Sequence, residues 1–99
     1  MTNERDTYCD MRGMLSFLIL FLLSKKRMNG QEITEELEKR KGCKPSPGTV
    51  YPALKKLHEA ELIKEEKDQN KIFYKLTQKG EHELKISKIQ FCKIFSDIF

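Results

Sequence analysis

A mostly α-helical fold with a small β hairpin is predicted by three features of this 99-residue sequence. Apolar residues recur at helical spacing in three successive stretches, at 12–25, 30–41 and 47–60. Two short runs with β-branched and aromatic residues follow, at 62–67 and 71–77, and a polar turn separates them as in a hairpin. A last helical stretch runs from the cap residue Thr77 to near residue 99.

The composition is that of one small domain with a strongly charged surface. Hydrophobic residues make up 38% and charged residues 34% of the chain, and the formal net charge of +4 permits binding to a polyanion. The odd set of three separated cysteines, Cys9, Cys43 and Cys92, argues against a disulfide framework. Free thiols are typical of a reducing compartment, so a cytoplasmic location is predicted.

The apolar run 14–23 is interpreted as a core helix. It is shorter than the roughly 20 residues that span a bilayer, so no membrane partner is expected. Its basic residues follow the run at 25–27, whereas a signal peptide carries them before it.

The second and third helices have recognisable ends. A break at 28–30 offers Asn29 or Gly30 as the cap of helix 30–41, and Gly42 is suited to end it. Ser46 is predicted to cap helix 47–60 through its hydroxyl, with Pro47 in the first helical position.

Helix 47–60 is the most informative segment. Val50, Leu54 and Leu57 form an apolar stripe, and the other face carries polar and basic residues. A short helix with a buried stripe and a basic outer face can enter the major groove of DNA.

The first and last helices are expected to pair with a second copy. Helix 12–25 is apolar nearly all round, so it needs cover on more than one side, and the last helix is rich in aromatic residues. The residues predicted at a homodimer interface are Leu15, Phe17, Leu18, Phe21, Leu84, Phe91, Phe95 and Ile98.

Three helices, a two-stranded wing and a further helix follow the order of a winged helix-turn-helix. The predicted organisation is a polar N-terminal arm at 1–11, a winged helix DNA-binding domain at 12–78 and a C-terminal dimerisation helix at 79–99.

Four motifs in this order resemble the PadR-like transcriptional regulators. They are the apolar opening helix at 12–20, Gly30-Gln31-Glu32-Ile33 at the start of the second helix, the segment 46–57, and 73–80 with its Tyr-x-Leu-Thr-x-x-Gly pattern. The resemblance covers roughly 12–84. The sequence departs from the family where a proline is common before the second helix, because Arg27 precedes Met28 here.

The resemblance implies a dimeric repressor that reads a palindromic operator in double-stranded DNA. The residues predicted to contact DNA are Ser46, Thr49, Tyr51, Pro52, Lys55, Lys56, Lys67, Asn70 and Lys71. Tyr51 is assigned to a phosphate because it lies off the apolar stripe. Glu65, Glu66 and Asp68 weaken the wing as an anion-binding element.

A protein–protein interaction module with the same core is the alternative function. A neutral or acidic face around Thr49, Lys55 and Lys56 would favour it. No catalytic residues, cofactor or metal site are predicted, because the sequence lacks a phosphate-binding glycine loop and metal-ligand spacing. A small-molecule effector is left open.

Overall fold

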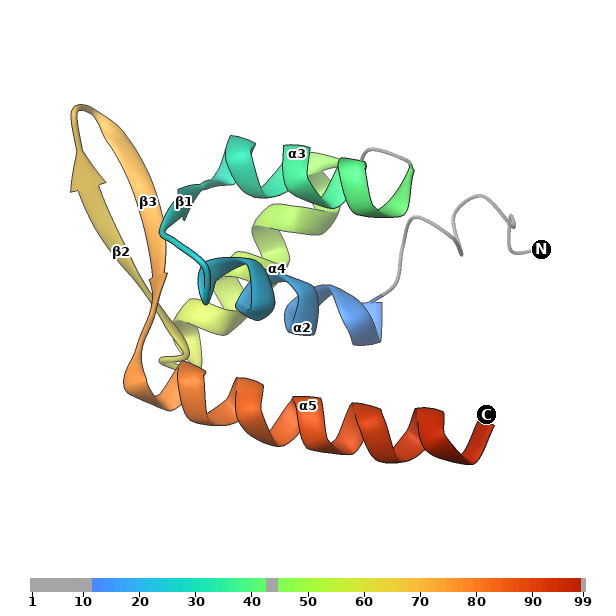
Figure 1. The fold of residues 1–99 in the computed structure, drawn as a ribbon. Helices are drawn as coiled ribbons and strands as arrows, with labels where there is room; N and C mark the ends of the chain where they lie inside the picture. Colours follow the sequence, from blue (N-terminus) through green and yellow to red (C-terminus); the bar gives the residue numbers. More distant parts are fainter. Residues whose placement is uncertain (1–11, 43–44, 99) are drawn as a thin grey trace.

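The computed structural model describes residues 12–42 and 45–98 of the chain. The predicted arm at 1–11 lies outside the described residues, as do Cys9 and Cys43. The described chain contains four helices and a three-stranded antiparallel sheet, in the order expected for a winged helix (Figure 1). The predicted fold class is therefore confirmed.

Helix α2 (Arg12–Leu23) lies at the centre of the molecule, between α5 and the α3–α4 pair (Figure 1). Leu15, Ile19 and Leu22 are buried along it. The helix ends at Leu23 and not at residue 25 as predicted. The amide of Lys25 bonds the Leu22 carbonyl, three residues back, and the Ser24 hydroxyl donates to the Phe21 carbonyl, so the last turn is closed locally.

Helix α3 (Gly30–Lys41) has the predicted bounds because both of its ends are capped. The Asn29 side chain accepts from the Glu32 amide at 2.8 Å, and the Glu32 carboxylate accepts from the Asn29 amide at 3.0 Å. This reciprocal capping box satisfies two free amides. Gly42 takes the left-handed conformation at φ 79° and ends the helix. Ile33 and Leu37 are fully buried.

Helix α4 (Pro47–Glu59) starts where predicted but is capped differently. The Ser46 hydroxyl bonds no backbone amide and instead lies 3.0 Å from the Thr49 hydroxyl. The prediction of a side-chain cap at Ser46 is wrong in this respect, because the Thr49 hydroxyl competes for the same oxygen. Val50, Leu54 and Leu57 are buried, as the stripe predicts.

Strands β2 (Ile63–Asp68) and β3 (Lys71–Leu76) form the predicted hairpin, each within one residue of its expected bounds. Gln69 and Asn70 both have positive φ, which is the geometry of a tight two-residue hairpin turn. A third strand, β1 (Met28–Asn29), pairs with β3 and was not predicted. Two residues are too short a run to show a strand period, so the sequence indicated only a break there.

Helix α5 (Gln78–Ile98) is capped at its N-terminus by Thr77. The Thr77 hydroxyl accepts from the Gly80 amide at 3.0 Å and donates to the Glu61 carbonyl at 2.6 Å. The helix runs along α2 (Figure 1). Leu84 belongs to the core that α2, α3 and α4 share. The domain division at residue 78 remains a prediction.

Gly80 is expected to tolerate no side chain. A Cβ atom at this position would overlap the backbone carbonyl of Leu62, which cannot rotate away. Gly80→Ala should lower the free energy of unfolding by about 2 kcal/mol. The matched control is Gly48→Ala, where a Cβ would meet nothing closer than the Ser46 hydroxyl at 3.8 Å, so a change below about 1 kcal/mol is expected. Chemical denaturation of both variants measures this, and equal effects would contradict the assignment.

Candidate nucleic-acid interface

The exposed face of α4 is set by the burial of its other face. Because Val50 and Leu54 are fully buried, the side chains that point the opposite way remain in solvent. Tyr51, Pro52, Lys55 and Lys56 are all exposed, Ser46 is exposed just before the helix, and Thr49 is half-buried. The structure therefore brings together the six predicted contact residues of this segment along one helix and its first turn.

The N-terminal half of α4 borders an open hollow against α2. Its lining includes Leu15 and Ser16 from α2 and Thr49, Pro52 and Lys56 from α4. Thr49, Pro52 and Lys56, which are predicted to contact DNA, thus border this hollow.

Tyr51 joins α4 to the start of α3. The exposed fraction of this residue is 49%, yet its ring lies directly over Gly30. A Cβ atom on Gly30 would lie 2.5 Å from the Tyr51 hydroxyl oxygen, so only glycine permits this approach. A second hollow lies here, between Tyr51, the α3 N-terminus and the wing residues Asn70, Lys71 and Ile72. Tyr51 therefore lies between the start of α3 and the β2–β3 hairpin.

The β2–β3 hairpin, called the wing below, has two faces, and each of them carries acidic and basic residues. Residues paired across the strands point to the same face, so Lys67 accompanies Ile72 and Glu65 accompanies Tyr74. This face is turned toward Tyr51. The opposite face carries Glu66 with Phe73, and Asp68 with Lys71. The predicted wing contacts Lys67 and Asn70 are exposed, as is Lys71.

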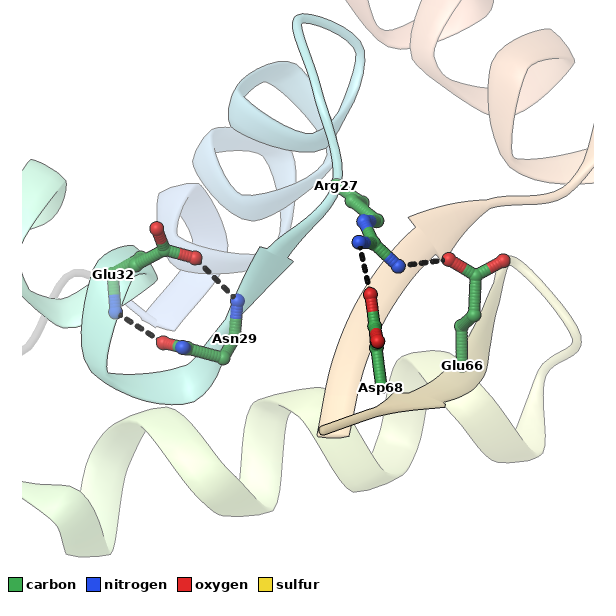
Figure 2. A network of polar contacts seen from close by, with 5 residues as sticks. All are labelled: Arg27, Asn29, Glu32, Glu66 and Asp68. Atoms are coloured by element: carbon green, nitrogen blue, oxygen red, sulfur yellow. Dashed lines mark hydrogen bonds and ion pairs between the residues drawn. The ribbon is translucent and has the colours of Figure 1, made fainter. Parts of the chain in front are cut away.

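Two of the three wing acids are paired with Arg27, as Figure 2 shows. Its guanidinium lies 2.5 Å from the Glu66 carboxylate and 2.6 Å from the Asp68 carboxylate, and these hydrogen bonds raise the pKa of Arg27 further above its ordinary value. The same guanidinium lies 4.4 Å from the centre of the Phe73 ring. Sequence analysis noted Arg27 only as a departure from a family pattern, because nothing local links residue 27 to residues 66 and 68.

The sequence pattern of the family described as "Transcriptional regulator PadR-like family" matches residues 19–86, which is more than half of the chain. The chain belongs to the PadR-like family of transcriptional regulators.

Solved structures of this family have the same fold. A PadR family transcription regulator from Clostridium difficile is 29% identical, with a TM-score of 0.82, over 87% of this chain and 95% of that chain. A PadR-like transcription factor from Bacteroides fragilis is 27% identical, with a TM-score of 0.77, over 87% of each chain. A PadR-like regulator from Bacillus cereus, 24% identical, has a TM-score of 0.81 over 89% of this chain and 90% of its own. No curated protein matches the sequence.

In this PadR-like chain, the residues predicted at a homodimer interface divide into three groups. Leu15 and Leu84 are buried within one chain, with 3% and 5% exposed, so they already belong to its core. Phe17, Leu18, Phe21 and Phe91 are half-buried. The rings of Phe17 and Phe91 stack within the chain, with centroids 5.3 Å apart. The side chains of Phe95 and Ile98 lie outside the described part of the structure.

Sequence analysis gave no role to two exposed apolar residues of α5, Ile86 and Ile89. Ile86, Ile89 and Ile94 are 37%, 59% and 60% exposed, so they lie outside the face through which Leu84 packs into the core. The signal was present, because Ile86 and Ile89 are three residues apart and share a helical face. The aromatic residues of α5 drew attention to a different part of its surface.

Tyr74 is the one tyrosine of the wing. Burial raises the pKa of Tyr74, and the nearby Glu65 and Tyr51 act in the same direction. Its hydroxyl therefore stays protonated at neutral pH and can only act as a hydrogen-bond donor or acceptor.

Within residues 12–42 and 45–98, no group of acidic, histidine and cysteine side chains is arranged to hold a metal ion. Among the helices described, none is long and apolar enough to cross a bilayer.

Gly30→Ala is expected to displace the Tyr51 ring. The side chain is half exposed and can rotate, so the free energy of unfolding should fall by less than about 1 kcal/mol. The ring proton signals of Tyr51 in an NMR spectrum should move, while Gly48→Ala serves as the control for adding a methyl group to a helix start. Unchanged Tyr51 signals in the Gly30 variant would show that the ring does not occupy this contact.

Proposed function

We propose that this PadR-like chain is a sequence-specific DNA-binding repressor that acts as a cytoplasmic homodimer on a palindromic operator. The observation that carries the proposal is the outer face of α4. Lys55 and Lys56 are exposed there, and the helix has no acidic residue before Glu59 at its end. A basic face of this kind favours a polyanion over the acidic or neutral surface expected of a protein-interaction module.

Contacts to phosphates and bases are divided between α4 and the wing. Lys55 and Tyr51 are assigned to the phosphate backbone, which positions a protein without reading sequence. Ser46, Thr49, Pro52 and Lys56 are assigned to base edges, with Pro52 against a thymine methyl and Lys56 toward guanine. In the wing, Asn70 and Lys71 line the hollow next to Tyr51, and Lys67 lies on the face that is turned toward Tyr51. These three residues therefore extend the surface formed by α4.

Direct readout by these side chains is limited. Serine, threonine and proline discriminate bases less than arginine or asparagine does, so DNA shape and deformability supply part of the specificity. Selection of bound duplexes from a random pool tests this. A pool that converges on two inverted half-sites one helical turn apart, about 34 Å, supports the proposal. A pool that shows no enrichment contradicts it.

The homodimer is proposed to form through α5 together with α2. Ile86 and Ile89 form an exposed apolar pair on one face of α5, Ile94 is exposed further along the helix, and half-buried Leu18 and Phe21 on α2 add apolar surface. Covering such side chains with a second copy removes them from water, which stabilises the pair by about 25 cal/mol for each Å² of apolar surface buried. Two copies joined in this way present two α4 helices to one DNA duplex.

Removal of the two lysines on α4 should weaken binding to every DNA sequence. In Lys55→Ala/Lys56→Ala, the slope of log affinity against log salt should become shallower by roughly 0.9 for each phosphate that the protein no longer neutralises. The control Lys79→Ala/Lys85→Ala removes the same charge from exposed positions on α5. Titration of selected and random duplexes at several salt concentrations measures both, and equal slopes for the α4 variant and the unaltered protein would exclude Lys55 as a phosphate ligand.

Ile89→Glu should convert the dimer to a monomer. A carboxylate at the centre of an apolar contact between copies would be buried without a partner, which is costly. Light scattering of the variant is expected to give the mass of one chain, whereas the control Glu38→Lys, an exposed change on α3, should leave the dimer intact. A dimeric Ile89→Glu protein would mean that copies associate through another surface.

A further inference from the structure

Arg27 is the point at which the wing is tied to the helices. One guanidinium reaches two carboxylates of β2, on Glu66 and Asp68 (Figure 2). The same guanidinium lies over the Phe73 ring of β3. All three partners occupy the same face of the wing, because Glu66 and Phe73 are paired across the strands and Asp68 is two residues beyond Glu66. The Arg27 side chain therefore contacts both strands of the wing on the same face.

The neighbours of Arg27 connect this contact to the rest of the surface. Met28 and Asn29, the two residues after Arg27, form β1 and pair with Tyr74 and Phe73 of β3. Asn29 is also the cap of α3, through its reciprocal bonds with Glu32 (Figure 2). The residues from Arg27 to Glu32 thus hold the wing and the start of α3 in one arrangement.

The strand register decides which face of the wing each acid occupies. Glu66 and Asp68 lie on the face opposite Ile72 and Tyr74, which is the face turned away from Tyr51. Lys67 and Glu65 lie on the Tyr51 side, whereas Lys64, Lys71 and Lys75 share the face of Glu66 and Asp68. Two of the three wing acids are thus turned away from Tyr51, and Arg27 offsets one of their two negative charges.

We propose that Arg27 is a positioning residue of the wing, which acts through Glu66 and Asp68 to hold the hairpin against the helices and to keep its acidic charge from opposing DNA. The proposal rests on the proposed DNA-binding function. Arg27 itself contacts no DNA in this scheme. Exposed ion pairs add little to global stability, so the effect is on the placement and charge of the wing.

The first test compares Arg27→Ala with Lys26→Ala, a neighbouring exposed cation. Both variants lose one positive charge, but Lys26 lies outside the contacts to Glu66 and Asp68. Affinity for the duplex selected by the unaltered protein should fall roughly three- to tenfold in Arg27→Ala and less than twofold in Lys26→Ala. Equal losses in both variants would mean that only net charge matters, which overturns the proposal.

The second test places Arg27→Ala in the Glu66→Gln/Asp68→Asn background. If Arg27 acts through these carboxylates, its removal there should change affinity by less than twofold. If Arg27 contacts a phosphate directly, the same three- to tenfold loss should appear in both backgrounds, and the proposal fails.

A third measurement does not depend on DNA. Hydrogen exchange of the wing peptides covering 63–76 should be faster in Arg27→Ala than in the unaltered protein or in Lys26→Ala, because the hairpin loses its side-chain anchor. Unchanged exchange overturns the positioning role. If the unaltered protein selects no duplex, the proposed function fails, while hydrogen exchange still decides whether Arg27 holds the wing.

Discussion

Burial of the Val50, Leu54 and Leu57 stripe is the constraint on which this structure depends. These side chains lie in the same core as Ile19 of α2 and Ile33 of α3, and so fix the rotation of α4 about its axis. Once that rotation is set, Tyr51, Lys55 and Lys56 must point outward. Core packing therefore decides which side chains of α4 are exposed. A change in the stripe would rotate the helix and expose different side chains.

The wing is placed by a different kind of interaction. Its hairpin is anchored at the base, where Ile63 and Leu76 are buried, and at its side by the short strand β1 and by Arg27. The side contacts are polar and exposed, so the wing is less firmly held than the helices.

Helix α5 has two apolar sides with different roles. Leu84 packs into the core and Phe91 stacks on Phe17, which binds α5 to its own chain. Ile86, Ile89 and Ile94 are exposed, and the proposed dimer would cover them. A domain of this size buries a modest share of its surface, so association adds to what one core supplies.

The order of the four helices and the hairpin, the end of α3 at Gly42, and the buried stripe of α4 were determined by the sequence alone, which left the cap of α3 open between Asn29 and Gly30. Each depends on residues a few positions apart, and local spacing records such relations. The strand β1, the Gly30–Tyr51 contact and the pairing of Arg27 with Glu66 and Asp68 were decided only by the tertiary structure. They join residues far apart in the chain, whose approach depends on how the whole chain packs and not on any local pattern.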